Sequence, residues 1–191
     1  RVLAMDLHSA QIQGYFDIPC DHIYGSPVLI DYLETLNLKD VVVVSPDVGG
    51  VARARAFAKL MKDAPLAIID KRRSAHNIAE SLTVIGEVKG KTAILIDDMI
   101  DTGGTICSGA NLLKKEGANR IFACASHAVF SPPSYERLST KDLFEQVIVT
   151  NSIPVLVKDN FPQLKVLSVA NMLGEAIWRI HEESSVSSMF R

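Results

Sequence analysis

The sequence predicts an α/β domain built on a mainly parallel sheet flanked by helices. Short apolar runs rich in β-branched residues alternate with longer segments in which apolar residues recur at helical spacing. The runs at 41–44 and 93–96 are apolar throughout, which is typical of strands buried on both faces of a parallel sheet. With 191 residues, of which 48% are hydrophobic, the chain is long enough to form one compact domain with a sizeable core.

The expected elements follow from this alternation and from the turn residues between the runs. Strands are expected at 2–5, 41–44, 66–69, 93–96, 120–125, 146–150 and 164–168. Helices are expected near 26–36, from the turn at 47–50 through 61, at 106–116 and at 171–181, with a helix or loop around 132–138. The segments 85–86 and 89–91 are interpreted as turns that bound a short hairpin.

Asp101 opens the segment Asp-Thr-Gly-Gly-Thr, which joins a predicted strand to a predicted helix and has the composition of a phosphate-binding turn. A helix N-terminus offers unpaired N–H groups and a partial positive charge. Gly103 and Gly104 allow those amides to approach a ligand closely. Thr102 and Thr105 add hydroxyl donors. The segment therefore suits a phosphate monoester.

Asp97 and Asp98 come just before this turn, at the end of the apolar run 93–96. Carboxylates accept hydrogen bonds from vicinal hydroxyls, directly or through a divalent cation. Together with the turn, the two aspartates predict a site for ribose 5-phosphate. An ordinary strand-to-helix connection is the alternative, but it does not explain two adjacent carboxylates where an unpaired buried charge is costly.

Four polar segments are expected at the carboxyl ends of strands, where sheets of this kind bind their ligands. These segments are 6–8, 45–50, 70–73 and 97–105. One site that all four segments form explains them better than four unrelated loops.

Asp6 and His8 are two residues apart, so in extended backbone their side chains project to the same face. An imidazole beside a carboxylate can ligate a divalent metal, although an isolated pair of this kind is better explained by an aspartate that orients a structural histidine. Asp47 favours the metal site because it arrives from a neighbouring strand end. Asp17 and Asp21 can join such a site through water, or serve as turn and capping residues.

Lys71, Arg72 and Arg73 form a dense cationic run beside the polar loop 74–77. A mobile loop with positive charge can close over a polyphosphate. A short basic run is ordinarily a solvated surface, and the neighbouring phosphate pocket favours the functional interpretation here. Alternation along the strand would point Lys71 and Arg73 the same way, with Arg72 opposed.

The composition excludes several classes of protein. The chain has 20 basic and 22 acidic side chains, and its net charge of −2 argues against nucleic-acid and membrane-surface binding. Its three cysteines form no CxxC pair, so a disulfide framework and a structural zinc site are not expected, and a reduced compartment is favoured. No apolar run reaches transmembrane length. The chain begins at Arg1 in what looks like the middle of a strand, so we interpret it as a fragment.

The chain closely resembles the ribose-phosphate diphosphokinase family, also called the phosphoribosyl pyrophosphate synthetases, in the motifs DLHSAQIQGYFDIPCD, SPDVGGVARA, IIDKRRSAHN and ILIDDMIDTGGT. The resemblance covers essentially the whole chain and implies a phosphoribosyltransferase-like (type I) fold. Residues 1–191 would form the carboxyl-terminal domain of a two-domain subunit, with the amino-terminal domain and much of the adenine site missing. The implied reaction transfers the diphosphoryl group of ATP to the anomeric hydroxyl of ribose 5-phosphate, with Mg²⁺, and gives AMP.

The resemblance also implies roles for the residues that match the family's motifs. Asp97 would bind the sugar hydroxyls, and the turn at 101–105 would bind the 5-phosphate. Lys71 would be the catalytic cation, and Arg73 would assist at the sugar phosphate and the transferring group. The implied metal ligands are His8, Asp47, Asp6, Asp17 and Asp21.

The family's members assemble into dimers and often hexamers, so the resemblance also implies a homo-oligomer, located in the cytoplasm or, for a plant protein, in the plastid stroma. Two alternatives stay open at this point. A phosphoribosyltransferase has a similar acidic turn, but the DLHSAQIQGYF and KRR segments argue against it. A non-catalytic regulatory subunit would keep the fold, and the presence of His8, Lys71 and Arg73 argues against that.

Overall fold

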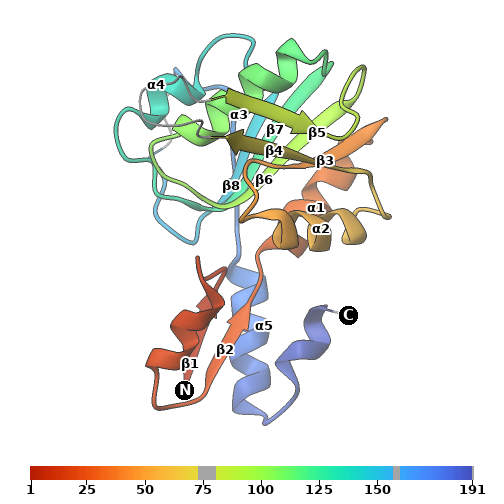
Figure 1. Ribbon diagram of the computed structural model, residues 1–191. Coiled ribbons are helices and arrows are strands. Elements are labelled where there is room, and N and C mark those ends of the chain that lie inside the picture. The colour runs from red at the N-terminus through yellow and green to blue at the C-terminus, as the bar shows by residue number, and fades with distance from the viewer. Residues whose placement is uncertain (73–80, 157–159, 191) are drawn as a thin grey trace.

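A computed structural model describes residues 1–72, 81–156 and 160–190. In this part of the chain, seven strands form the main sheet in the order β5-β4-β3-β6-β7-β8-β9 (Figure 1). Neighbouring strands are parallel except β4 and β5, which are antiparallel. The strands of this sheet are β3 (Val41–Ser45), β4 (Leu66–Arg72), β5 (Ser81–Ile85), β6 (Thr92–Ile100), β7 (Arg120–Ala128), β8 (Gln146–Thr150) and β9 (Leu164–Leu167).

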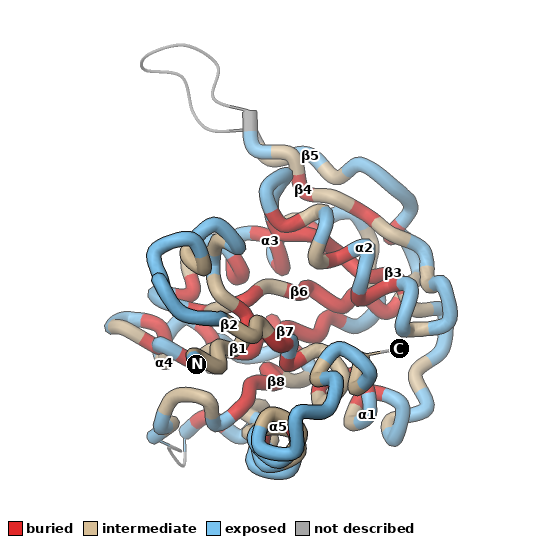
Figure 2. Tube along the Cα trace, turned by 90° about the horizontal axis from the view of Figure 1, so that it is seen from below, coloured by how far each residue is buried: buried red, intermediate tan, exposed pale blue. Residues whose placement is uncertain are grey.

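Helices cover both faces of the sheet. Side chains of α1 (Ser26–Thr35) and α2 (Val51–Leu60) pack with the even-numbered residues of β6, such as Ile94, in one core cluster. Side chains of α3 (Gly104–Lys115) and α4 (Ser134–Leu138) pack with the odd-numbered residues, such as Leu95, in the other. Figure 2 shows β6, β7 and β8 as the buried centre of this arrangement. The apolar runs are therefore buried on both faces, as the sequence predicted.

The first predicted strand lies outside the main sheet. β1 (Val2–Met5) pairs in parallel with β2 (Cys20–Ile23), and η1 (Ala10–Tyr15) connects them. These elements lie together with α5 (Ala170–His181) and η2 (Val186–Phe190) below the sheet in Figure 1. The sequence predicted that the first strand would end at the same sheet edge as the others. This was wrong, because β1 pairs with β2 in a separate sheet and not with a strand of the main sheet.

Several element boundaries differ from the prediction. β6 continues through both aspartates to Ile100, because it keeps pairing with β7 beyond Ile96. α3 begins at Gly104, two residues earlier than expected. β5 was not predicted as a strand, and its antiparallel pairing extends β4 as far as Arg72. No helix among the described residues is long and apolar enough to cross a membrane.

Candidate functional site

The turn between β3 and α2 is held by its own polar side chains. Ser45 Oγ donates to the carbonyl of Asp47 at 2.7 Å, and the Gly50 N–H donates to Asp47 Oδ1 at 2.7 Å. A Cβ on Gly50 would lie 2.9 Å from Ser45 Oγ, so the turn closes this tightly because residue 50 has no side chain. The turn determines where α2 begins, and therefore where Arg53, in its first turn, is placed.

Asp97 and Asp98 lie near the carboxyl end of β6, and Arg53 contacts both. Arg53 Nη1 is 3.1 Å from Asp97 Oδ1 and 3.4 Å from Asp98 Oδ1. Asp97 Oδ1 also accepts the Asp98 backbone N–H at 2.9 Å. The side chain of Asp98 is 2% exposed and that of Asp97 is 21% exposed. Asp97 is therefore the carboxylate of this pair that a ligand can reach.

His8 reaches the same pair from the loop after β1. Its Nδ1 lies 2.8 Å from Asp98 Oδ2, and its side chain is 73% exposed. The structure thus brings His8 together with the aspartates of β6, although β1 itself is not part of the main sheet. The imidazole remains accessible to a ligand that binds at Asp97.

The two carboxyl groups have opposite pKa shifts. Burial raises the pKa of Asp97 to about 7, and the hydrogen bond and negative charge of Asp98 add to this effect. Burial also acts to raise the pKa of Asp98, but hydrogen bonds with Asp97 and His8 and the charge of Arg53 outweigh it, so that this pKa is lowered. The two carboxyl groups therefore titrate as a pair, with the higher pKa at Asp97.

The predicted phosphate turn leads directly into α3. Gly103 has a φ of 74°, in the left-handed region that favours glycine, and no side chain of the described residues caps the helix. Gly104 is the first residue of the helix, and Asp101, Thr102 and Thr105 are exposed. The N–H groups of this first helical turn are therefore available to an anion.

Arg137 of α4 lies beside this turn. Its Nη1 donates to the carbonyl of Thr102 at 3.1 Å. A Cβ on Gly104 would lie 3.4 Å from that same Nη1, so the guanidinium is close to the start of α3. The turn is thus supported from the α4 side by a cation next to the helix N-terminus.

Asp6 does not share a face with His8 as predicted. It has a φ of 41° rather than an extended conformation, and it is buried. Its Oδ2 accepts the Gly25 N–H at 2.7 Å and a hydrogen bond from the Ser126 hydroxyl. Asp6 therefore ties the end of β1 to the start of α1 and to β7, which accounts for its burial without a metal.

The other residues of the predicted metal set are also dispersed. Asp47 caps its own turn, Asp21 pairs with Arg1 at 3.3 Å, and Asp17 is exposed. Within residues 1–72, 81–156 and 160–190, no group of three or more His, Cys, Asp or Glu side chains is arranged to hold a metal ion. The structure does not bring the five predicted ligands together. A cation that takes most of its ligands from a phosphorylated substrate and water still fits beside the reachable carboxylate of Asp97.

Lys71 is an exposed residue of β4, where it pairs with Leu82 of β5. It was expected after the end of the strand, in a cationic run beside the loop 74–77, and the pairing of β4 with β5 places it within the strand instead. Arg73 and the predicted lid segment 74–77 lie outside the described residues. Their roles stay predictions.

Sequence reasoning missed both arginines of the site. A signal for Arg53 exists, since a cation in the first turn of a helix opposes the helix dipole and indicates a specific anionic partner. Arg137 sits in a short helix where a basic residue is favourable, so its position carries no comparable signal.

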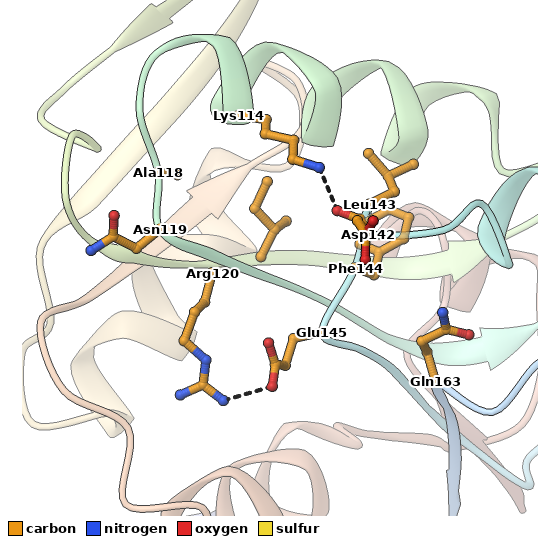
Figure 3. A pocket seen from close by; sticks show the side chains of 10 residues that line it. Lys114, Ala118, Asn119, Arg120, Asp142, Leu143, Phe144, Glu145 and Gln163 are labelled. Atoms are coloured by element: carbon orange, nitrogen blue, oxygen red, sulfur yellow. Dashed lines mark hydrogen bonds and ion pairs between the residues drawn. The ribbon is translucent and has the colours of Figure 1, made fainter.

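A separate hollow of about 280 Å³ lies at the amino ends of β7 and β8 (Figure 3). Lys114 Nζ donates to the carbonyl of Asp142 at 2.5 Å, and Arg120 pairs with Glu145 at 3.1 Å. These charges are matched within the hollow, which lies at the opposite sheet edge from the acid pair. It is not part of the candidate site.

Comparisons with known proteins agree with the predicted fold and family. The family model of the phosphoribosyl synthetase-associated domain matches residues 73–191. The chain is 94% identical to ribose-phosphate pyrophosphokinase of Prochlorococcus marinus subsp. pastoris and 66% identical to ribose-phosphate pyrophosphokinase 1 of Spinacia oleracea. Each alignment covers all of this chain but only 58% and 57% of those proteins.

A solved structure agrees as well. Phosphoribosylpyrophosphate synthetase from Mycobacterium smegmatis superposes with a TM-score of 0.86 at 43% identity, over 95% of this chain and 59% of that one. This confirms the predicted fold, a mainly parallel sheet flanked by helices of the phosphoribosyltransferase-like type. The chain spans a little under three fifths of the relatives it matches. The chain belongs to the phosphoribosyl synthetase-associated domain family.

Proposed function

We propose that the chain carries the ribose 5-phosphate site of a ribose-phosphate diphosphokinase. The full-length protein would transfer the diphosphoryl group of ATP to the anomeric hydroxyl of ribose 5-phosphate and release AMP. One observation carries this proposal: β6 carries a partly exposed carboxylate, Asp97, near its carboxyl end, and the chain continues within a few residues into an uncapped helix N-terminus. A hydroxyl-binding group and a phosphate-binding group therefore lie on one continuous strand, turn and helix.

The proposed binding mode divides the pentose phosphate between two parts of the site. The N–H groups at the start of α3 and the hydroxyls of Thr102 and Thr105 bind the 5-phosphate. Asp97 accepts hydrogen bonds from the sugar hydroxyls. The chemistry then depends on alignment and on neutralising charge, since phosphoryl transfer needs no protein nucleophile.

Mg²⁺, when bound, would offset the charge of the phosphate oxygens, and His8 and Asp97 are the residues of the site that would hold it. We propose that Lys71 contributes a further positive charge toward the transferring group and that Arg73 assists at the sugar phosphate and the same group. Assembly into a homo-oligomer and location in the cytoplasm or a plastid also remain proposals.

The test is ribose 5-phosphate-dependent release of AMP from ATP by the full-length protein, followed in a coupled assay. Lys71→Ala is expected to lower kcat much more than it raises either KM, because the lost charge acts in the transition state. Lys39→Ala, an exposed lysine on the loop before β3, is the matched control. Sugar transfer from phosphoribosyl diphosphate to a base, without AMP release from ATP, would instead identify a phosphoribosyltransferase.

A further inference from the structure

Arg53 is a charged residue of the site to which the sequence motifs assign no role. It lies in the first turn of α2, where the helix dipole disfavours a cation by about 0.3–1 kcal/mol. Its side chain is 29% exposed, so much of it is withdrawn from water. A partly buried cation in an unfavourable position is retained where it has a specific anionic partner.

That partner is the acid pair on β6. Arg53 Nη1 is within 3.1 Å of Asp97 Oδ1 and 3.4 Å of Asp98 Oδ1, so one nitrogen bridges the two side chains. His8 contacts Asp98 and not the other carboxyl. Among the residues that the structure describes, Arg53 is therefore the positively charged side chain that contacts Asp97.

The geometry also determines which part of Asp97 faces a ligand. Its Oδ1 receives two donors from the protein, Arg53 Nη1 and the Asp98 N–H. A carboxylate with one oxygen held by two donors has a defined orientation, and it keeps acceptor capacity for external hydroxyls. Without the guanidinium, a single backbone bond would hold the side chain, and other rotamers would become accessible.

We propose that Arg53 is a positioning residue for sugar recognition, which acts through Asp97 by fixing the orientation of its carboxylate toward the hydroxyls of the pentose phosphate. This inference rests on the proposed function, because it assigns Asp97 to the sugar. Arg53 acts on the sugar only through that carboxylate and does not itself contact the reacting atoms. Its loss should weaken use of the pentose phosphate and leave use of the nucleotide nearly unchanged.

The experiment measures kcat and both KM values for the full-length protein with Arg53→Met, Arg53→Lys, Asp97→Asn and the double variant Arg53→Met/Asp97→Asn. Arg53→Met should raise the KM for ribose 5-phosphate by about 10- to 100-fold, the range of a charge-assisted hydrogen bond. The KM for ATP should change by less than about 2-fold. Arg53→Lys should recover part of the loss, since an ammonium retains the charge but not the planar fork. Arg55→Met removes an exposed arginine of the same helix and should resemble the wild type.

The double variant separates positioning from a general structural effect. If Arg53 acts through Asp97, then Arg53→Met should raise the KM for ribose 5-phosphate by less than about 3-fold in the Asp97→Asn background. Multiplicative effects of the two substitutions would overturn the proposal, and so would parallel increases in both KM values with no rescue by lysine. If Arg53→Met does not fold, Arg53→Lys and its combination with Asp97→Asn provide the same comparison. A wild-type protein without ribose 5-phosphate-dependent AMP release would overturn the proposed function itself, whereas an active wild type with multiplicative effects overturns only the role of Arg53.

Discussion

Replacement of Asp97 by asparagine should stabilise the protein at neutral pH while it damages the site. The substitution keeps the size and shape of the side chain and removes its titration. Burial and the neighbouring Asp98 raise the pKa of Asp97 to about 7 in the folded state, from an ordinary value of 3.8. The folded protein therefore binds the Asp97 proton more tightly than the unfolded chain does.

The direction of the pH effect follows from this difference. Where the folded state holds more protons, the free energy of unfolding falls as the pH rises, here between about pH 4 and about pH 7. Each pKa unit corresponds to about 1.4 kcal/mol, and the slope flattens near the folded-state pKa, so the wild type should lose about 2 kcal/mol relative to Asp97→Asn between about pH 5 and about pH 7. The lowered pKa of Asp98 acts in the opposite direction and at more acidic pH, outside this window.

Urea unfolding of the wild type and of Asp97→Asn at several pH values across this range measures the difference. Asp31→Asn, which changes an exposed carboxylate of α1, is the control and should follow the wild type at every pH. The variant should gain stability relative to the wild type as the pH rises and should lose use of ribose 5-phosphate. A stability difference that does not vary with pH would refute the raised pKa of Asp97.

Three further predictions concern the glycine turn and the buried Asp6. Gly103→Ala should destabilise the protein by about 1–2 kcal/mol in thermal unfolding, because its φ of 74° disfavours a side chain. Arg137→Met should raise the KM for ribose 5-phosphate by about 3- to 10-fold, because the turn carbonyl of Thr102 loses its donor. Asp6→Ala should lower the free energy of unfolding by about 2–3 kcal/mol without changing the Mg²⁺ dependence of the rate, because it leaves the Ser126 hydroxyl without its acceptor.

The main sheet could be predicted because the apolar runs of its strands fit only one environment, a sheet that is covered on both faces. A run such as 41–44 or 147–149, apolar throughout and bounded by polar residues, is stable only as a strand with both faces covered. The position of β1 could not be predicted in this way. A strand's composition indicates that it pairs, but the choice between β2 and the main sheet depends on contacts between distant segments.

The end of β6 could not be predicted either, because it also depends on pairing with another strand. Charged residues after an apolar run usually mark a strand end, yet Asp97 lies opposite Ala125 and Met99 opposite His127 in a continued parallel ladder. Backbone pairing with β7 outweighs the low strand propensity of aspartate. The two carboxylates are therefore held on regular secondary structure rather than on a loop, which gives them a defined geometry.

The site could be predicted where it is contiguous in the sequence. The acid pair and the glycine turn lie within one segment, and their types alone indicate a sugar and a phosphate. Arg53 is distant in sequence from Asp97, and its contact depends on the tight turn that Gly50 permits. The expectation for Asp6 was wrong because it assumed extended backbone, whereas a φ of 41° turns the side chain inward.

The unequal surroundings of the two aspartates indicate a division of roles between them. Asp98 is nearly fully buried and has Arg53 and His8 as partners, so its negative charge is compensated within the protein. Asp97 has Arg53 and a backbone amide, is more exposed, and keeps a raised pKa, so its charge is compensated incompletely. A ligand or cation that supplies the missing positive charge or hydrogen-bond donors would be bound more favourably at Asp97 than at Asp98. We therefore propose that Asp97 is the recognition group and that Asp98 fixes Arg53 and His8 in place.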